Sequence, residues 1–353
     1  MTPSVHPVLP APLDEATSRK IAAFGLVCAF FVTMVHSGQP APRDPAQADW
    51  WFFRMTAGVF GRLAVPFYFA VAGFFLARRA GEPGWWKRAV GKRWHTLALP
   101  YLFWLAVWDV FAVLLAMQGN WREGTGLWTG LPAGWDALAF AGLHPFREPF
   151  SVSLWFLRSL LLFVLASPLL FRLLRRSGAG VPALLSVLSV GCLSGVLPAW
   201  ADGLANRFVS VQGLSFFAAG AWLALSGARL PEGRLAAVAG GAGFAGLVFS
   251  RWMLARGMAG ADAVHAFFLP AALLGAWRAM PAVRWPKRLT DCTFAVYLLH
   301  VFVLRLLLAA IHGKTGCAVL VFKYLSGFGV ALAAALALHR FFPRFSSFAF
   351  GGR

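Results

Sequence analysis

The stretch KIAAFGLVCAFFVTMVHS, residues 20–37, decides the class of this protein, because nearly all of its side chains are apolar. About 20 predominantly apolar residues are enough for a helix to cross the hydrocarbon core of a bilayer. Comparable runs recur along the chain of 353 residues, which is 59% hydrophobic and only 13% charged. These features predict an all-α fold, that of a polytopic membrane protein whose helices span the lipid bilayer.

The apolar runs predict about ten transmembrane helices. They are expected at residues 20–37, 55–77, 96–117, 153–171, 181–198, 209–226, 235–254, 263–277, 291–311 and 317–338. We expect a disordered tail at 1–18, a membrane domain of ten helices at 19–340 and an interfacial tail at 341–353. No Lys or Arg precedes residue 19 and no A-x-A-like site follows the first run, so we expect no cleaved signal peptide.

Lys and Arg residues lie in short blocks between the runs, and their distribution predicts the orientation. If both termini are cytoplasmic, the inside segments hold 20 of these residues and the outside loops hold six, which is the usual asymmetry. The net charge of +19 therefore reflects topology and does not indicate nucleic-acid binding, which needs basic residues gathered on one solvated face. The longest outside loop, about 118–152, has the Trp, Gly and Pro content of an interfacial or re-entrant segment.

The four cysteines have no spacing typical of a metal site or a disulfide framework. Cys28, Cys192, Cys292 and Cys317 all lie in or beside apolar runs. We interpret them as small core residues, and the sequence predicts no metal site.

Ionisable side chains inside the predicted spans are candidate functional residues, because a charge that faces lipid is costly. They are His36, Arg62, Asp109, Arg158, His300, Arg305 and Lys323. Arg158, Arg305 and Lys323 lie near span ends, so snorkelling to the interface explains them as well as a functional role does. Asp109 fits either a structural ion pair with an arginine or proton handling. His300 lies near mid-span, where a hydrogen bond to a neighbouring helix is sufficient to explain it.

His36 differs from the other candidates because it ends the first span at the predicted outer face and is followed by Ser37 and Gly38. At that position we expect the imidazole to face water rather than lipid. An imidazole ordinarily changes its charge near neutral pH, so it can accept a proton from a hydroxyl group. His300 lies deeper and His95 lies on the cytoplasmic side, so we select His36 as the candidate general base.

Five stretches resemble motifs of one enzyme family, in the family's order. They are VTMVHS at 32–37, GRLAVPFYFAVAGFFLARR at 61–79, KRWHTLALPYLFW at 92–104, SLWFLRSLLLFVLASPLL at 153–170 and FAVYLLHVFVL at 294–304. With the predicted spans, they resemble the acyltransferase-3 family of integral membrane O-acyltransferases, in the branch that includes fucose O-acetylase-like proteins. The resemblance covers about residues 19–340, although 177–285 carries only hydropathy.

The resemblance implies transfer of an acyl group, expected to be acetyl, from cytoplasmic acyl-CoA to a hydroxyl of a cell-surface or lipid-linked sugar. Acetyl-CoA is then a substrate, no bound cofactor is expected, and the location is the bacterial cytoplasmic (inner) membrane. We assign His36, Arg62 and Asp109 to the catalytic set. The residues expected on the acceptor side or in structural roles are Ser37, Trp155, Arg158, Tyr297 and His300.

Three positions depart from the family pattern. Gly25 stands where a cation often precedes the histidine by eleven residues, Thr96 replaces the second Arg of a pair, and Ala72 replaces a Ser. We therefore expect neighbouring cations to bind the phosphates of the acyl donor, for which Arg and Lys are suitable ligands. These residues are Arg88, Lys92, Arg93 and His95. Positive-inside topology alone also explains most of this basic cluster.

Two other functions remain open at this stage. Intramembrane Arg and His also suit a transporter or flippase of a lipid-linked sugar. Transporters of the common folds tend to have two halves with matching interrupted helices, and no such duplication is visible in this sequence, which favours the enzyme. The departures at Gly25 and Thr96 leave a catalytically silent scaffold as the third alternative.

Overall fold

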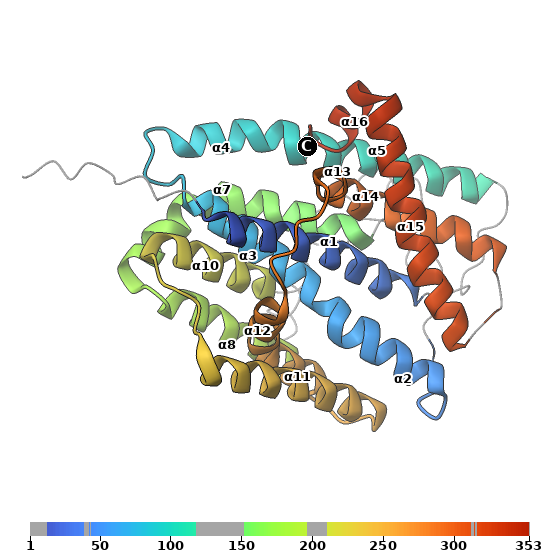
Figure 1. Cartoon of the computed structure of the whole chain (residues 1–353), viewed down its shortest axis with the longest axis horizontal. Coiled ribbons are helices and arrows are strands. Elements are labelled where there is room, and N and C mark those ends of the chain that lie inside the picture. The colour runs from blue at the N-terminus through green and yellow to red at the C-terminus, as the bar shows by residue number, and fades with distance from the viewer. Residues whose placement is uncertain are drawn as a thin grey trace, which may run out of the picture.

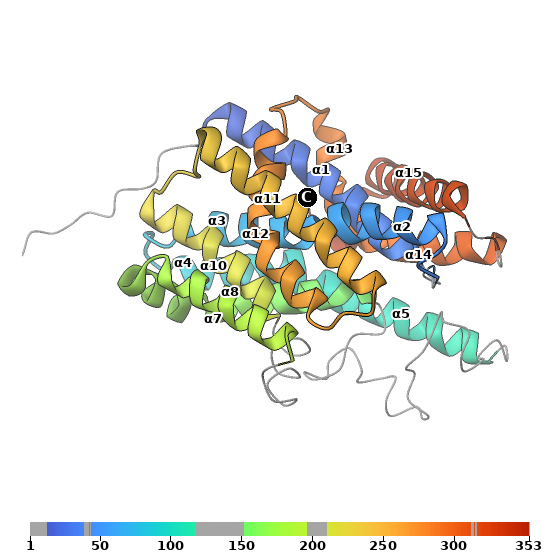
Figure 2. The same ribbon diagram turned by 90° about the horizontal axis from the view of Figure 1, so that it is seen from below.

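The computed structural model describes residues 13–38, 42, 44–117, 152–195, 210–311, 314 and 316–352. Within these ranges the chain is helical and contains no strand. Figures 1 and 2 show the helices side by side in one bundle, with many consecutive helices running in opposite directions. The predicted loop at 118–152 lies almost entirely outside the described residues.

Within the described ranges, the helices follow one another with mostly short connections. In chain order they are α1 (Glu15–Ser37), α2 (Ala48–Met55), η1 (Thr56–Phe60), η2 (Gly61–Leu63), α3 (Ala64–Ala77), α4 (Trp85–Arg93), η3 (Trp94–Ala98), α5 (Leu99–Met117), η4 (Val152–Leu154), α7 (Trp155–Ser177), α8 (Gly180–Leu193), α10 (Val211–Ser226), α11 (Gly233–Ala255), α12 (Ala261–Ala279), α13 (Lys287–Asp291), α14 (Thr293–Ala310), α15 (Cys317–Phe341) and α16 (Pro343–Ala349).

Five helices of the described part are long and apolar enough to cross a membrane. They are Glu15–Ser37, Ala48–Ala77, Trp155–Ser177, Gly233–Ala255 and Cys317–Phe341. Shorter apolar helices lie among them, and a helix covers most of each predicted span. Many outward side chains of α8 and α11 are exposed and apolar, which is typical of helices that face lipid. The total of ten crossings and the cytoplasmic position of both termini stay predictions.

The first helix begins at Glu15, ahead of the predicted span at 20. Asp14 caps it, because its carboxylate accepts the backbone N–H of Thr17 at 2.7 Å and the Thr17 hydroxyl at 2.7 Å. These bonds stabilise the charged carboxylate and lower the pKa of Asp14 below its ordinary value. The predicted tail at 1–18 thus overlaps the first turn of α1, and residues 1–12 lie outside the described ranges.

Glycines let two pairs of helices approach closely. A Cβ on Gly73 of α3 would lie 2.0 Å from the carbonyl oxygen of Phe217 in α10, and a Cβ on Gly220 would lie 1.9 Å from that of Ala70. On α11, a Cβ on Gly240 would lie 2.6 Å from a backbone atom of α12. Small residues at such contacts are typical of helix packing in membranes, where backbones come together without a hydrophobic driving force.

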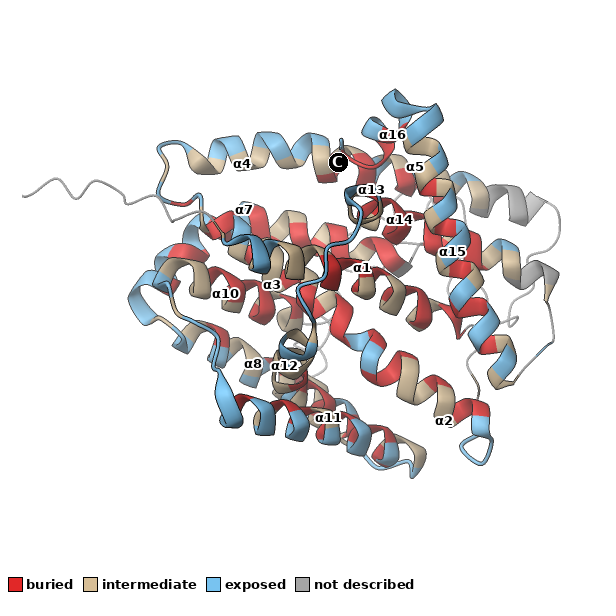
Figure 3. Ribbon diagram, viewed as in Figure 1, coloured by how far each residue is buried: buried red, intermediate tan, exposed pale blue. Residues whose placement is uncertain are grey.

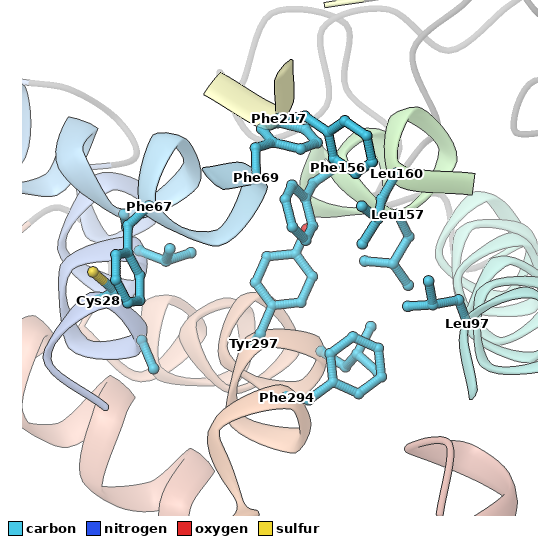
Figure 4. Close-up of a cluster of buried hydrophobic side chains, with 14 of the residues drawn as sticks. Cys28, Phe67, Phe69, Leu97, Phe156, Leu157, Leu160, Phe217, Phe294 and Tyr297 are labelled. Carbon is cyan, nitrogen blue, oxygen red and sulfur yellow. The ribbon is translucent and has the colours of Figure 1, made fainter. Parts of the chain in front are cut away.

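Buried residues, whose ribbon is red in Figure 3, concentrate in the middle of the bundle. Figure 4 shows part of this core, in which Phe69, Phe156 and Tyr297 lie together. The rings of Phe69 and Phe156 have centroids 4.6 Å apart, and those of Phe156 and Tyr297 are 5.5 Å apart. This aromatic core connects α3, α7 and α14 and lies between the two cavities described below.

Candidate active site

A cavity of about 390 Å³ lies where the end of α1 meets the helix over residues 48–77. His36 lines it, and we call it the His36 cavity. The predicted residues Arg62 and Trp155 also line it, as do two arginines that the sequence analysis did not select, Arg54 and Arg251. The structure therefore gathers the candidate base and three guanidinium groups around one space.

The helix that carries Arg62 changes its winding at this cavity. It is π-helical over Thr56–Phe60 and 3-10 over Gly61–Leu63. Gly61 allows close contact with α1, because a Cβ there would lie 2.6 Å from Cγ2 of Val35. Single-turn π segments are rare in proteins, and those that occur often lie at functional sites. This change of winding positions Arg62 toward the cavity beside the end of α1.

His36 lies against a second histidine. Its ring centroid is 5.1 Å from that of His300 on α14, which is fully buried. His300 Nδ1 lies 2.6 Å from the carbonyl oxygen of Tyr297. A carbonyl can only accept, so Nδ1 carries the proton and donates it, which leaves Nε2 as an acceptor. Among the described residues Nε2 has no hydrogen-bond partner. His300, which was predicted to lie too deep to act as the base, thus contacts His36, the predicted base.

A second, larger cavity of about 780 Å³ lies beside the other half of the same helix. We call it the Lys92 cavity. Its lining includes the cations Arg79, Lys92, Arg93 and Lys287 and the carboxylate of Asp291, which pairs with Lys287 at 2.5 Å; a second π segment, η3, forms part of the wall. All four cations belong to segments that are predicted to be cytoplasmic. The excess of positive over negative groups around this space suits a ligand with several phosphates.

Two of the four predicted donor-binding residues line the Lys92 cavity and two do not. Lys92 and Arg93 are in its wall. Arg88 is exposed, pairs with Glu82 at 2.8 Å and donates to the carbonyl of Pro83, and His95 is exposed outside the lining. Arg79 and Lys287, which were not among the predicted donor-binding residues, complete the set of cations.

Two positions that depart from the family pattern, Gly25 and Thr96, make defined contacts in the structure. The carbonyl of Gly25 accepts a hydrogen bond from the Tyr68 hydroxyl at 2.7 Å, which links α1 to α3. Thr96 lines the Lys92 cavity and its hydroxyl donates to the carbonyl of Lys92 at 3.1 Å. Gly351, with φ of 74°, packs so closely that a Cβ would lie 2.4 Å from the Thr96 carbonyl oxygen. The C-terminal segment therefore covers the position that carries a cation in the family pattern.

The two cavities approach each other at an aromatic wall. Tyr68 and Phe156 line the Lys92 cavity, whereas their chain neighbours Phe69 and Trp155 line the His36 cavity. Phe69 and Phe156 are in ring contact, so the wall is formed where these two rings meet (Figure 4). Tyr297 also lines the Lys92 cavity, and its hydroxyl donates to the carbonyl of Ser153.

The remaining predicted residues lie away from the lining of both cavities. Ser37 is buried and its hydroxyl donates to the carbonyl of Thr33 at 2.6 Å, within its own helix. Asp109 on α5 has one carboxylate oxygen buried without a hydrogen-bond partner in the described part of the chain. Arg158 is half-buried on α7. The described residues contain no group of three or more His, Cys, Asp or Glu side chains that could hold a metal ion.

A sequence signal for the missed residues existed. Arg54 lies in WWFFRM and Arg251 in LVFSRWML, both apolar stretches in which an arginine is unexpected. His265 is a third case, since it is buried on α12 with both ring nitrogens lacking a partner among the described residues. A search for every charged or titratable group within apolar runs, including the span ends, would have found all three.

The fold and these cavities define a helical membrane protein in which a histidine cavity and a cation-lined cavity meet at an aromatic wall. Residues 26–340 match the family model described as an acyltransferase domain, and the chain belongs to this family, acyltransferase-3. This finding confirms the resemblance seen in the five sequence motifs.

A curated relative is the succinoglycan biosynthesis protein ExoH of Rhizobium meliloti (strain 1021). The two sequences are 29% identical over 176 residues, which cover 46% of this chain and 45% of the relative. The chain thus matches less than half of that protein's length. No solved structure matches the chain.

Proposed function

We propose that this protein transfers an acyl group, expected to be acetyl, from cytoplasmic acyl-CoA to a hydroxyl of a cell-surface or lipid-linked sugar. The observation that carries the proposal is the position of His36 in a cavity that meets a cation-lined cavity at the Phe69–Phe156 pair. Membership of an acyltransferase family supports the reaction class. The relative's name refers to succinoglycan biosynthesis, which supports a polysaccharide or its precursor as the acceptor.

The Lys92 cavity is the proposed donor site. Coenzyme A carries a 3′-phosphate and a pyrophosphate, and the arginine and lysine side chains of this cavity suit both groups. The thioester end of the donor then reaches the aromatic wall near Phe156. Because Phe69 lies directly behind Phe156, a displacement of these rings brings the acyl carbon to the His36 cavity.

His36 acts in the proposed reaction as the general base. Its imidazole accepts the proton of the acceptor hydroxyl while the hydroxyl oxygen attacks the carbonyl carbon of the thioester. Arg62 stabilises the negative charge that develops on the carbonyl oxygen. The carbon–sulfur bond then breaks, the ester forms, and the coenzyme A thiolate takes up the proton.

The test uses purified protein in liposomes with radiolabelled acetyl-CoA and a sugar acceptor. We expect labelled ester in the wild type, and a loss of about 10² to 10⁴ in rate in His36→Ala and His36→Gln with an unchanged size-exclusion profile. Movement of the sugar across the membrane without acylation would instead support a flippase. Near wild-type turnover in both variants would show that His36 is not the base.

A further inference from the structure

The His36 cavity holds more positive charge than a neutral sugar and a thioester require. Arg54, Arg62 and Arg251 line it, and no carboxylate occurs among its described lining residues. Arg62 lies close enough to act electrostatically on both other arginines. Three guanidinium groups around about 390 Å³ repel one another, so their gathering requires compensation by negative charge.

Arg251 is the most informative of the three because its side chain is only 3% exposed. Its Nε donates to the Ser250 hydroxyl at 3.2 Å. Its nearest carboxylate is that of Asp262, at 3.8 Å from Nη2, which is beyond hydrogen-bond distance, and the Asp262 side chain is 68% exposed. A guanidinium has five N–H donors, and a buried one is costly unless most of them are bonded. Arg251 therefore has donors left for a ligand.

Arg54 and Arg62 also lack a carboxylate partner in the described part of the chain. Arg54 places its guanidinium carbon 5.2 Å from the ring centre of Trp50, and its buried Nε has no hydrogen-bond partner there. Arg62 is exposed to the cavity, without an ion pair among the described residues. Asp262, whose side chain is 68% exposed, is thus the carboxylate that acts on Arg54 and Arg251 in the described part of the chain.

We propose that the His36 cavity binds an anionic group of the substrate, a carboxylate held by Arg54 and Arg251. Arginine suits such groups because its planar fork matches two oxygens at once. The group belongs either to an acidic acceptor sugar or to the far end of the transferred acyl chain. This inference rests on the proposed function and names the substrate class of that same site.

The rest of the cavity wall fits a sugar that carries such a group. Trp155 offers an aromatic face, and Ser210 and Gln212 at the start of α10 offer hydroxyl and amide groups. Gly58 lets the Arg251 side chain lie against the π segment, since a Cβ there would be 3.1 Å from Arg251 Cδ. The arginine that supplies charge is therefore fixed by packing against the same helix that carries Arg62.

The test measures equilibrium binding to the purified full chain in nanodiscs, without acyl donor. The probes are glucuronate with glucose as its neutral match, and monomethyl succinate with methyl butyrate as its neutral match. We expect one anion to bind at least about tenfold more tightly than its neutral match. Preference for glucuronate assigns the charge to the acceptor, and preference for monomethyl succinate assigns it to the acyl group. Equal binding within both pairs overturns the proposal.

Variants locate the binding. Arg54→Gln and Arg251→Gln should each remove the preference for the anion, whereas Arg79→Gln, in the Lys92 cavity, should retain it. Arg54 is half-buried, so its variant stays informative even if replacement of the buried Arg251 impairs folding. A preference that persists in Arg54→Gln and disappears in Arg79→Gln would place the anion in the other cavity and contradict the proposal.

The outcome is separable from that of the proposed function. Binding of these probes needs no thioester and no turnover, so it can succeed where acyl transfer fails. Conversely, acetyl transfer to a neutral sugar by a protein that shows no preference for either anion would keep the proposed function and remove the anionic substrate.

Discussion

The ring of His36 on α1 lies 5.1 Å, centroid to centroid, from the ring of His300 on α14. His300 is held by the bond from Nδ1–H to the carbonyl of Tyr297 and cannot turn without losing it. The ring of His300 is therefore fixed in the core next to His36. We expect His300 to act as a positioning residue for the proposed base.

Replacement of His300 tests this role. His300→Phe keeps a ring in the core but removes both nitrogens, and we expect kcat to fall by about tenfold or more while KM for acyl-CoA stays unchanged. The pH dependence of kcat should also change shape, because one of two adjacent imidazoles is lost. If only thermal stability changes and the pH profile is retained, His300 is merely part of the core.

Arg62 is expected to act on the transition state. Arg62→Ala should lower kcat by about 10² to 10³, the usual effect of removing one donor to a developing oxyanion. Arg62→Lys should recover only part of the loss, because an ammonium cannot form the two-pronged contact of a guanidinium. Steady-state kinetics with acetyl-CoA measures both variants. Full activity in Arg62→Lys would reduce the role of Arg62 to a general positive charge.

The aromatic wall is expected to keep water from the donor thioester. Phe156→Ala removes one of the two rings that separate the cavities, so hydrolysis of acyl-CoA without acceptor should rise while transfer to the acceptor falls. Phe171→Ala is the matched control, because Phe171 is buried on the same helix, lines neither cavity and stacks on Trp85 rather than on the rings of the wall. Both variants should lose about 3 to 5 kcal/mol of stability. Equal hydrolysis rates in the two would contradict a role for the wall.

Hydropathy predicts the helices because crossing a bilayer imposes one simple requirement, a long apolar segment with satisfied backbone groups. The start of α1 is also encoded locally, because the N-cap Asp14 lies three residues before Thr17, whose backbone N–H donates to its carboxylate. His36 and Arg62 could also be selected as candidates from a local pattern, because each is an ionisable residue in an apolar run.

Other features of the site depend on tertiary contacts that no local pattern specifies. The π turn at Thr56–Phe60 has no sequence signature that predicts it, and it directly precedes Gly61, which lies close to α1. Arg251 is far from Arg62 in sequence, and only the packing of α11 brings it to the cavity. Tertiary contacts also decide which basic residues line the Lys92 cavity. Arg88 forms an ion pair with Glu82 outside it, whereas Arg79 is part of its lining.

The predicted orientation can be measured with topology reporters. A reporter fused after Arg79 should read as cytoplasmic, and one fused after Met258, between α11 and α12, should read as external. The basis is the excess of basic residues in the segments assigned to the inside, 20 against six. A cytoplasmic signal after Met258 would place the His36 cavity on the donor side and exclude an external acceptor.

The position of α11, which carries Arg251, depends on its close contact with α12. A Cβ on Gly240 would lie 2.6 Å from Gly275 Cα, whereas one on the adjacent Gly241 would meet no atom within 4 Å. Gly240→Ala should therefore destabilise the protein by about 1 to 3 kcal/mol through overpacking. Gly241→Ala should be neutral or should stabilise by up to about 1 kcal/mol, because alanine favours the helix more than glycine does. Thermal unfolding in detergent compares the two variants, and a lower Tm confined to Gly240→Ala is the expected result. Equal melting temperatures would show that α11 and α12 are not packed backbone to backbone.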